Sequence, residues 1–220
     1  MKASINPSIL SADFVNFEAE FETIVGCDQV HVDVMDNHFV PNLTFGLQMV
    51  SSMQRITKRP LDVHLMISDA DRFAPDYAKT GAYSVTVHFE ACSDPALTAK
   101  LLRQNGAKAG LAIKPATALD EILPIIQHFD RLLIMTVEPG FGGQLLIEET
   151  LAKVAAARAH FDMKNLAIDL QVDGGITADN IGRVAALGAN SFVAGSAVFK
   201  ASDRNLEINR LRDLATKHSH

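Results

Sequence analysis

The sequence contains little cysteine, the residue that cross-links small secreted domains and binds zinc in structural zinc modules. Its 220 residues include two cysteines, Cys27 and Cys92, and no Cys-x-x-Cys pair. This scarcity excludes a disulfide scaffold and a structural zinc finger. No apolar run approaches the roughly 20 residues that cross a bilayer, and residues 1–14 lack the continuous apolar core of a signal peptide. We therefore expect a cytoplasmic protein that does not bind a membrane.

Basic clusters and several common nucleotide and hydrolase motifs are also absent. The chain has 20 Lys and Arg residues against 26 Asp and Glu residues, a formal charge of −6 without a dense basic run. This balance argues against a nucleic-acid partner. No Gly-x-Gly-x-x-Gly follows a predicted strand, which argues against a dinucleotide-binding site. No Gly-x-Ser-x-Gly occurs, which argues against the nucleophile turn of a serine hydrolase. An anionic substrate remains compatible, because backbone N–H groups can hold a phosphate locally.

Short apolar runs do alternate with longer amphipathic runs along the whole chain. The predicted strands are Ser4–Leu10, Gln29–Met35, Pro60–Met66, Tyr83–His88, Ala107–Ile113, Arg131–Val137, Ala167–Val172 and Asn190–Ala194. The predicted helices include Phe14–Val25, Ala70–Thr80, Pro95–Asn105, Leu119–Phe129, Ile147–Phe161, Ala178–Leu187 and Asn205–Thr216. Strands that alternate with helices imply a parallel sheet.

The number of these units favours a closed barrel. Eight strand–helix units in 220 residues suit a (β/α)₈ TIM barrel better than an open, doubly wound sheet. Gly81, Gly106 and Gly188 each come just before a predicted strand, where glycine supplies the left-handed residue that ends a helix. We expect an α/β fold in which residues 1–220 form a single barrel domain. In such barrels the active site lies at the carboxyl ends of the strands.

The predicted second strand carries an unusual polar face. In His31-Val-Asp33-Val-Met35, side chains two apart share a face, so the imidazole, the carboxylate and the thioether point one way and the valines the other. A buried carboxylate needs a partner, and a bound cation would supply one. His64 on the third strand and Asp173 at the end of the seventh add the same residue types at the same rim.

Taken singly, each of these residues is more often structural, because a lone strand histidine is commonly a hydrogen-bonded core group. Their convergence on one rim is what favours a site for a first-row divalent ion. By pattern alone, the three methionines at strand ends are better explained as flexible core fillers than as a cover over a reactive centre; they are Met35, Met66 and Met135. His88 and Glu90 are interpreted as groups that support the ligands or anchor a loop.

Glycine-rich turns follow the last three strands. They are Gly140-Phe141-Gly142-Gly143 after the sixth, Gly174-Gly175 after the seventh and Gly195-Ser196 after the eighth. Loops after strands seven and eight frequently bind phosphate in these barrels, since glycine lets consecutive N–H groups approach an anion. A phosphate beside a metal with two carboxylates indicates a phosphosugar enzyme. A metal can acidify the carbon next to a carbonyl, and two carboxylates can then remove and return its proton.

Six segments, spread over nearly the whole chain and in family order, together resemble the ribulose-phosphate 3-epimerase family. They are Asn6-Pro-Ser-Ile-Leu-Ser-Ala-Asp13, His31-Val-Asp-Val-Met-Asp36 with Phe39-Val-Pro-Asn42, Leu61-Asp-Val-His-Leu-Met66, Met135-Thr-Val-Glu-Pro-Gly-Phe-Gly-Gly-Gln144, Val172-Asp-Gly-Gly-Ile176 and Ala194-Gly-Ser-Ala-Val-Phe199. The resemblance implies a (β/α)₈ barrel of the ribulose-phosphate-binding type. It implies interconversion of D-ribulose 5-phosphate and D-xylulose 5-phosphate in the pentose phosphate pathway through an ene-diolate intermediate.

The resemblance also implies roles for individual residues. One divalent ion, most often Zn²⁺ but otherwise Fe²⁺, Mn²⁺ or Co²⁺, is expected on His31, Asp33, His64 and Asp173, with the two aspartates as the acid/base pair. Ser8 and His64 are expected to contact the sugar, and Met35, Met66 and Met135 to cap the site, which reverses the preference from pattern alone. The phosphate is expected on Gly142, Gly143, Gly175, Gly195 and Ser196, with Gly140, Phe141 and Gly174 alongside. By the same resemblance, we expect a homo-oligomer, from a dimer to a hexamer.

Two positions depart from the commoner family pattern, with Asn37 in place of glycine and Lys114 in place of asparagine. Both lie near the rim, where a substitution can change loop geometry or substrate preference. Three alternatives remain open: an epimerase for a ketohexose phosphate such as allulose 6-phosphate, a metal-dependent lyase, and a non-catalytic phosphosugar-binding protein. Turnover on both sugars and solvent-proton exchange at C3 separate them.

Overall fold

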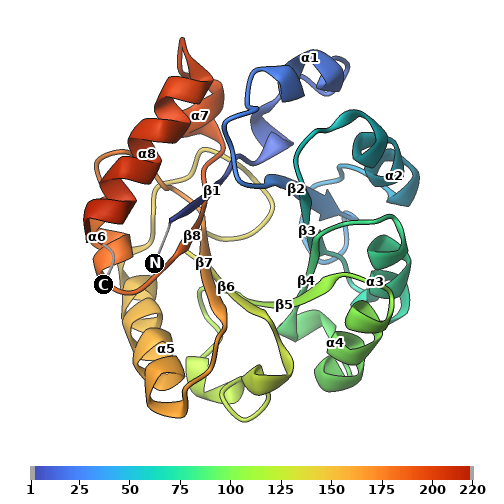
Figure 1. Ribbon diagram of the computed structural model, residues 1–220. Helices are drawn as coiled ribbons and strands as arrows, with labels where there is room; N and C mark the ends of the chain where they lie inside the picture. Colours follow the sequence, from blue (N-terminus) through green and yellow to red (C-terminus); the bar gives the residue numbers. More distant parts are fainter. Residues whose placement is uncertain (1–2, 219–220) are drawn as a thin grey trace.

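The computed structural model describes residues 3–218, and its strands form one closed ring of parallel pairs (Figure 1). The hydrogen-bonded order is β1-β8-β7-β6-β5-β4-β3-β2. The strands are β1 (Ser4–Asn6), β2 (Val30–Met35), β3 (Leu61–Met66), β4 (Ser84–His88), β5 (Lys108–Ile113), β6 (Arg131–Met135), β7 (Asp169–Asp173) and β8 (Ser191–Val193). The predicted (β/α)₈ barrel is therefore confirmed.

The ring closes between its first and second strands through a single bridge. Ser8 pairs with His31 in parallel, and the N–H of His31 donates to the carbonyl oxygen of Pro7 at 3.0 Å. Strand β1 is shorter than predicted, because the chain turns into the 3₁₀ helix η1 (Ile9–Ser11), which the Ser8 hydroxyl caps by accepting from the N–H of Leu10. The closure therefore lies directly beside the polar face of β2.

Helices surround the ring (Figure 1). The α-helices are α1 (Phe17–Glu22), α2 (Leu47–Ile56), α3 (Ala70–Lys79), α4 (Pro95–Gln104), α5 (Leu151–Lys164), α6 (Ile181–Ala186), α7 (Ser196–Phe199) and α8 (Arg204–His218). The other 3₁₀ helices are η2 (Phe89–Ala91), η3 (Leu119–Glu121), η4 (Ile126–His128) and η5 (Glu148–Thr150). Over residues 3–218, none of these helices is long and apolar enough to cross a membrane.

One predicted helix is absent from the structure, and the structure contains a helix, α2, that was not predicted. The run predicted as a helix over Leu119–Phe129 forms the 3₁₀ helices η3 and η4 instead. Pro124 lies between them, and proline lacks an N–H and disfavours helical backbone at the residue before it. Helix α2 between β2 and β3 was not among the helices predicted, although its buried Val50 and Met53 have helical spacing.

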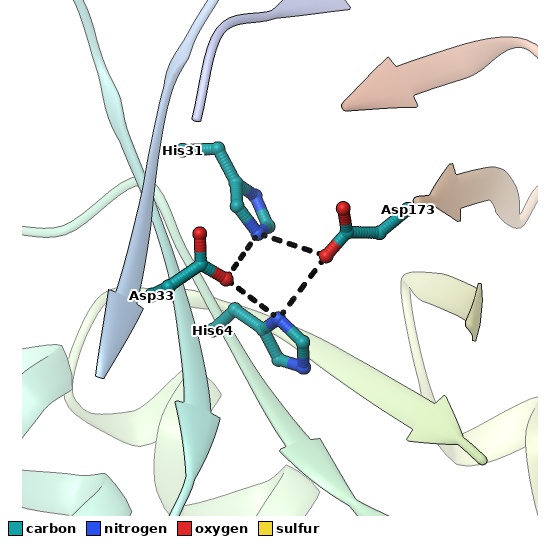
Figure 2. Close-up of side chains that lie close together, drawn as sticks. All are labelled: His31, Asp33, His64 and Asp173. Carbon is teal, nitrogen blue, oxygen red and sulfur yellow. Dashed lines mark hydrogen bonds and ion pairs between the residues drawn. The ribbon is translucent and has the colours of Figure 1, made fainter. Parts of the chain in front are cut away.

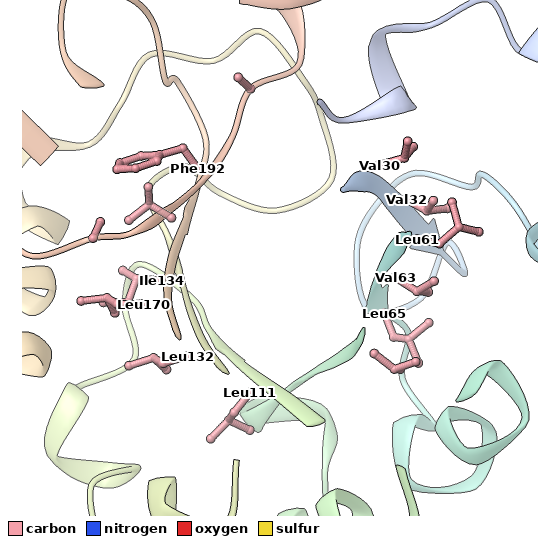
Figure 3. Close-up of a cluster of buried hydrophobic side chains, with 14 of the residues drawn as sticks. Val30, Val32, Leu61, Val63, Leu65, Leu111, Leu132, Ile134, Leu170 and Phe192 are labelled. Carbon is pink, nitrogen blue, oxygen red and sulfur yellow. The ribbon is translucent and has the colours of Figure 1, made fainter. Parts of the chain in front are cut away.

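The apolar core lies between the ring and the helices (Figure 3). Outward-facing side chains such as Val32, Val63 and Phe192 have no solvent exposure. Because side chains alternate along a strand, the residues between them point into the barrel. On β2 and β3 these inward residues include His31, Asp33 and His64, so the alternation that builds the core also places the polar groups inside.

Candidate metal centre and active site

Four side chains converge inside the carboxyl end of the barrel (Figure 2). His31 and Asp33 come from β2, His64 from β3 and Asp173 from the last position of β7. The Nε2 atom of His31 lies 3.3 Å from Asp33 Oδ1 and 3.7 Å from Asp173 Oδ2. The Nδ1 atom of His64 lies 3.3 Å and 3.6 Å from the same two oxygens. All four ligand atoms lie within 4.8 Å of one another, close enough to hold one metal ion.

Strand register brings these residues to one level. Asp33 on β2 is the Cα partner of His64 on β3, and Met135 on β6 is the partner of Asp173 on β7. Ser8, at the closure of the ring, donates its hydroxyl to Asp33 Oδ2 at 2.6 Å. One oxygen of Asp33 is thus held by a hydroxyl while the other faces both imidazoles.

The Nε2 atom of His31 is a buried polar atom without a hydrogen-bond partner. Its other nitrogen, Nδ1, lies 2.9 Å from Asp62 Oδ2. Buried polar atoms are nearly always paired, so an orphan nitrogen that faces two carboxylates needs an explanation. A cation between these groups satisfies it, and two imidazoles with two carboxylates are a suitable ligand set for a divalent transition metal. The residues present therefore fit a metal ion.

A polar layer beneath the cluster holds His31 in place. Arg131 donates to Asp62 Oδ1 at 2.6 Å and to the hydroxyl of Ser84 at 3.1 Å, and Gln171 donates to Asp62 Oδ2 at 2.8 Å. The side chains of Asp62 and Arg131 are buried. Asp62 lies two residues before His64 and therefore shares its face of β3, but the sequence did not indicate that Arg131 reaches it from the opposite side of the barrel.

Charge in this cluster shifts two pKa values in opposite directions. Burial opposes the charged form of His31, but the carboxylates of Asp33 and Asp62 outweigh it and raise the pKa of His31 well above 6.5. Burial likewise opposes ionisation of Asp33, yet the positive charge of His31 and the hydrogen bond of His64 lower the pKa of that carboxyl below its usual range. Asp33 is therefore a carboxylate at neutral pH.

A pocket that is open to solvent lies above the cluster. The residues predicted for the site that line it are Ser8, Asp33, Met35, Met66, Met135, Gly140, Phe141, Gly142, Gly143, Asp173, Gly174, Gly175, Gly195 and Ser196. The two exceptions, His31 and His64, are fully buried beneath it. The pocket also includes residues that were not predicted, among them Ser11, Glu138, Gln144 and Thr177. Ser11, Glu138 and Gln144 lie within segments that resemble the family, and Thr177 follows one, but no role was predicted for them.

Two of the glycine turns approach neighbouring residues closely. Gly175 has a φ of +67°, and a Cβ atom there would lie 2.4 Å from the backbone nitrogen of Leu146. A Cβ atom at Gly195 would lie 3.0 Å from the hydroxyl of Ser11. Both turns therefore bring bare backbone to the wall of the pocket, which is the property expected of an anion-binding turn.

The two departures from the commoner pattern do not reach the pocket wall. Asn37 has a φ of +58°, a left-handed conformation that asparagine adopts more readily than most other residues, so the position accepts asparagine in place of glycine. The Nζ atom of Lys114 lies 3.8 Å from the centroid of the Phe39 ring. Neither Asn37 nor Lys114 is among the residues that line the pocket.

Comparison with known proteins assigns the chain to a family. The model of the ribulose-phosphate 3 epimerase family matches residues 4–199. The chain belongs to the ribulose-phosphate 3-epimerase family. The ribulose-phosphate 3-epimerase of Mycobacterium bovis is 51% identical over 208 residues, covering 94% of this chain and 91% of that protein. The corresponding protein of Escherichia coli K12 is 44% identical over 219 residues, covering 98% and 97%.

Solved structures outside the ribulose-phosphate 3-epimerase family share the barrel. The crystal structure of KGPDC from Streptococcus mutans matches with a TM-score of 0.71 and 13% identity, covering 99% of each chain. The 3-hexulose-6-phosphate synthase of Salmonella typhimurium matches with a TM-score of 0.67 and 17% identity, covering 98% of this chain and 99% of that one. At these identities the similarity establishes the fold alone.

Proposed function

We propose that this enzyme inverts C3 of D-ribulose 5-phosphate to form D-xylulose 5-phosphate, and the reverse, in the pentose phosphate pathway. The observation that carries the proposal is the convergence of His31, Asp33, His64 and Asp173 below a pocket lined by glycine turns. Membership of the family supplies the reaction, and the geometry supplies groups suited to each part of it.

His31, Asp33, His64 and Asp173 would hold one divalent ion, most often zinc, with iron, manganese or cobalt as alternatives. Such an ion would act as a Lewis acid on the sugar carbonyl, acidifying the C3 proton and stabilising the ene-diolate. The Nε2 atom of His31 supports this assignment independently of the family, because it faces two carboxylates yet forms no hydrogen bond within the described part of the chain.

Asp33 and Asp173 are proposed as the acid/base pair. They come from β2 and β7 and lie on either side of the two imidazoles in Figure 2. In each direction of the reaction, one carboxylate removes the C3 proton from one face and the other, in its acid form, delivers a proton to the opposite face. Asp33 is ionised at neutral pH, as a base must be, and the Ser8 hydroxyl donates a hydrogen bond to one of its two oxygens.

The rest of the pocket is proposed to bind and cover the sugar phosphate. Backbone N–H groups at Gly142, Gly143, Gly175, Gly195 and Ser196 are assigned to the phosphate, beside Gly140, Phe141 and Gly174. Ser8 and His64 are assigned to the sugar. Met35, Met66 and Met135, each 2% exposed, are assigned to an apolar cap that keeps water from the ene-diolate. The cytoplasmic location, the single domain over residues 1–220 and the homo-oligomeric state remain predictions.

Proton exchange in deuterated water tests the proposal. NMR of D-ribulose 5-phosphate with zinc-loaded enzyme in D₂O should show D-xylulose 5-phosphate formed with deuterium at C3, because the two carboxylates exchange their protons with solvent. Parallel reactions with allulose 6-phosphate compare the pentose with the ketohexose. Cleavage of a carbon–carbon bond would indicate the lyase, binding without turnover would indicate the binding protein, and faster turnover of the hexose would overturn the pentose assignment.

A further inference from the structure

The second imidazole of the cluster is held from behind by another histidine. His64 directs Nδ1 at Asp33 and Asp173, while its Nε2 atom lies 2.9 Å from Nε2 of His88. His88 is the last residue of β4 and has no solvent exposure. Its other nitrogen, Nδ1, lies 3.2 Å from Oε2 of Glu90. A continuous row therefore runs from the metal-facing nitrogen to a carboxylate.

The protons in this row of side chains have one consistent arrangement. A metal ion needs a free lone pair on Nδ1 of His64, so a neutral His64 must carry its proton on Nε2. That N–H donates to Nε2 of His88, which must then be unprotonated. His88 therefore carries its proton on Nδ1 and donates it to Glu90, whose carboxylate is only an acceptor. The opposite tautomer of His88 would set a lone pair against the carboxylate.

Glu90 is itself fixed by the loop after β5. Its Oε1 atom accepts from the backbone N–H of Lys114 at 2.8 Å and from the hydroxyl of Thr117. These donors leave Oε2 for His88. Although burial favours the neutral acid, the hydrogen bonds from His88 and Lys114 lower the pKa of Glu90 to about 2. Lys153 donates to the carbonyl oxygens of Pro115 at 2.6 Å and Thr117 at 2.5 Å, which holds the loop in place.

We propose that His88 and Glu90 are positioning residues that hold His64 in the tautomer with Nδ1 free for the metal ion. The arrangement parallels the direct contact of Asp62 with His31, except that an imidazole lies between the ligand and the carboxylate. The proposal rests on the metal site of the proposed function and adds two residues that do not line the pocket. Groups that orient a ligand's second nitrogen typically contribute 10- to 100-fold to metal affinity.

The substitution Glu90→Gln tests the proposal with almost no change of shape. The N–H of Lys114 and the hydroxyl of Thr117 both donate, so the oxygen of the new amide is expected to face them. The NH₂ group of the amide then faces Nδ1 of His88. His88 would then accept at Nδ1 and carry its proton on Nε2. His64 would have to accept at Nε2, so its proton would occupy the metal-binding nitrogen.

Asp71→Asn is a matched control. Asp71 accepts from the backbone N–H of Ser93 at 2.6 Å and from the hydroxyl of Thr98 at 2.6 Å, the same kinds of contact that Glu90 makes with its loop. Neither of these partners is an imidazole. The control therefore removes a comparable carboxylate charge without affecting a metal ligand.

Two measurements decide the outcome. Calorimetric titration of metal-free protein with zinc should give about 10- to 100-fold weaker binding for Glu90→Gln than for wild type, and unchanged binding for Asp71→Asn. In zinc-loaded wild type, ¹⁵N NMR should place the proton of His88 on Nδ1, a result that needs no variant. A proton on Nε2 of His88, or equal zinc affinity in folded Glu90→Gln, would overturn the positioning role of His88 and Glu90 but not the metal site. Wild type that binds no zinc would overturn both the metal site and the positioning role.

Discussion

Replacing Asp173 by asparagine tests the two-carboxylate mechanism at its more accessible member. The side chain of Asp173 is 15% exposed at the floor of the pocket, and its ion-pair contacts with the two imidazoles are at 3.6 and 3.7 Å. Asparagine keeps the volume and makes no new clash, so we expect the fold to persist. It cannot carry the proton, and loss of a positioned acid or base slows a reaction about 10²- to 10⁴-fold, or ~3–5 kcal/mol in the barrier.

The variant should also separate exchange from inversion. Asp33 remains able to remove and return a proton on its own face, so Asp173→Asn should exchange the C3 proton of one epimer with D₂O while forming almost none of the other. NMR of both sugar phosphates, with zinc content measured on the same samples, detects this. The exposed Asp179→Asn is the control for loss of one negative charge and should behave as wild type. Inversion at near-normal rates in Asp173→Asn would refute the acid/base assignment.

Three further predictions concern neighbouring groups. Ser8→Ala removes the 2.6 Å bond to Asp33 and should lower kcat about 10-fold or more, since a hydrogen bond to a charged group contributes about 1.5–3 kcal/mol; steady-state kinetics measures this. Arg131→Met leaves Asp62 buried and without its cation, so chemical denaturation should show a loss of about 3–5 kcal/mol in unfolding free energy. The pKa of Glu90 falls from 4.5 to about 2 on folding, so its ionised form stabilises the protein fully above pH 4.5 and loses that effect as the pH falls toward 2. The stability advantage of wild type over Glu90→Gln should therefore shrink over that interval, by at most about 3 kcal/mol, in denaturation series at each pH.

Much of the site could be predicted because the face on which each side chain lies depends on the sequence of its own strand. The period of two along residues 31–35 and 62–66 places His31, Asp33 and His64 inside the barrel, and the structure confirms that side. The closed ring then brings the end of β7, with Asp173, to the same level. Local pattern and barrel topology together were enough to assemble these four residues.

The supporting groups could not be predicted in the same way. The contact of Arg131 with Asp62 joins β6 to β3 across the barrel, and it depends on the length of the arginine side chain and on sheet register. The row from His64 to Glu90 depends on ring orientations that no sequence period specifies. The helix predicted over Leu119–Phe129 failed for a local reason, since Pro124 interrupts an otherwise helical spacing.

The central claim is that two imidazoles and two carboxylates bind one divalent ion at the mouth of the barrel. Anomalous diffraction at the zinc absorption edge, from crystals of zinc-loaded protein, tests it most directly. We predict one strong peak per chain, within bonding distance of Nε2 of His31, Nδ1 of His64 and a carboxylate oxygen each of Asp33 and Asp173. Catalytically active crystals with no peak between these four side chains, or with the ion bound elsewhere, would contradict the account.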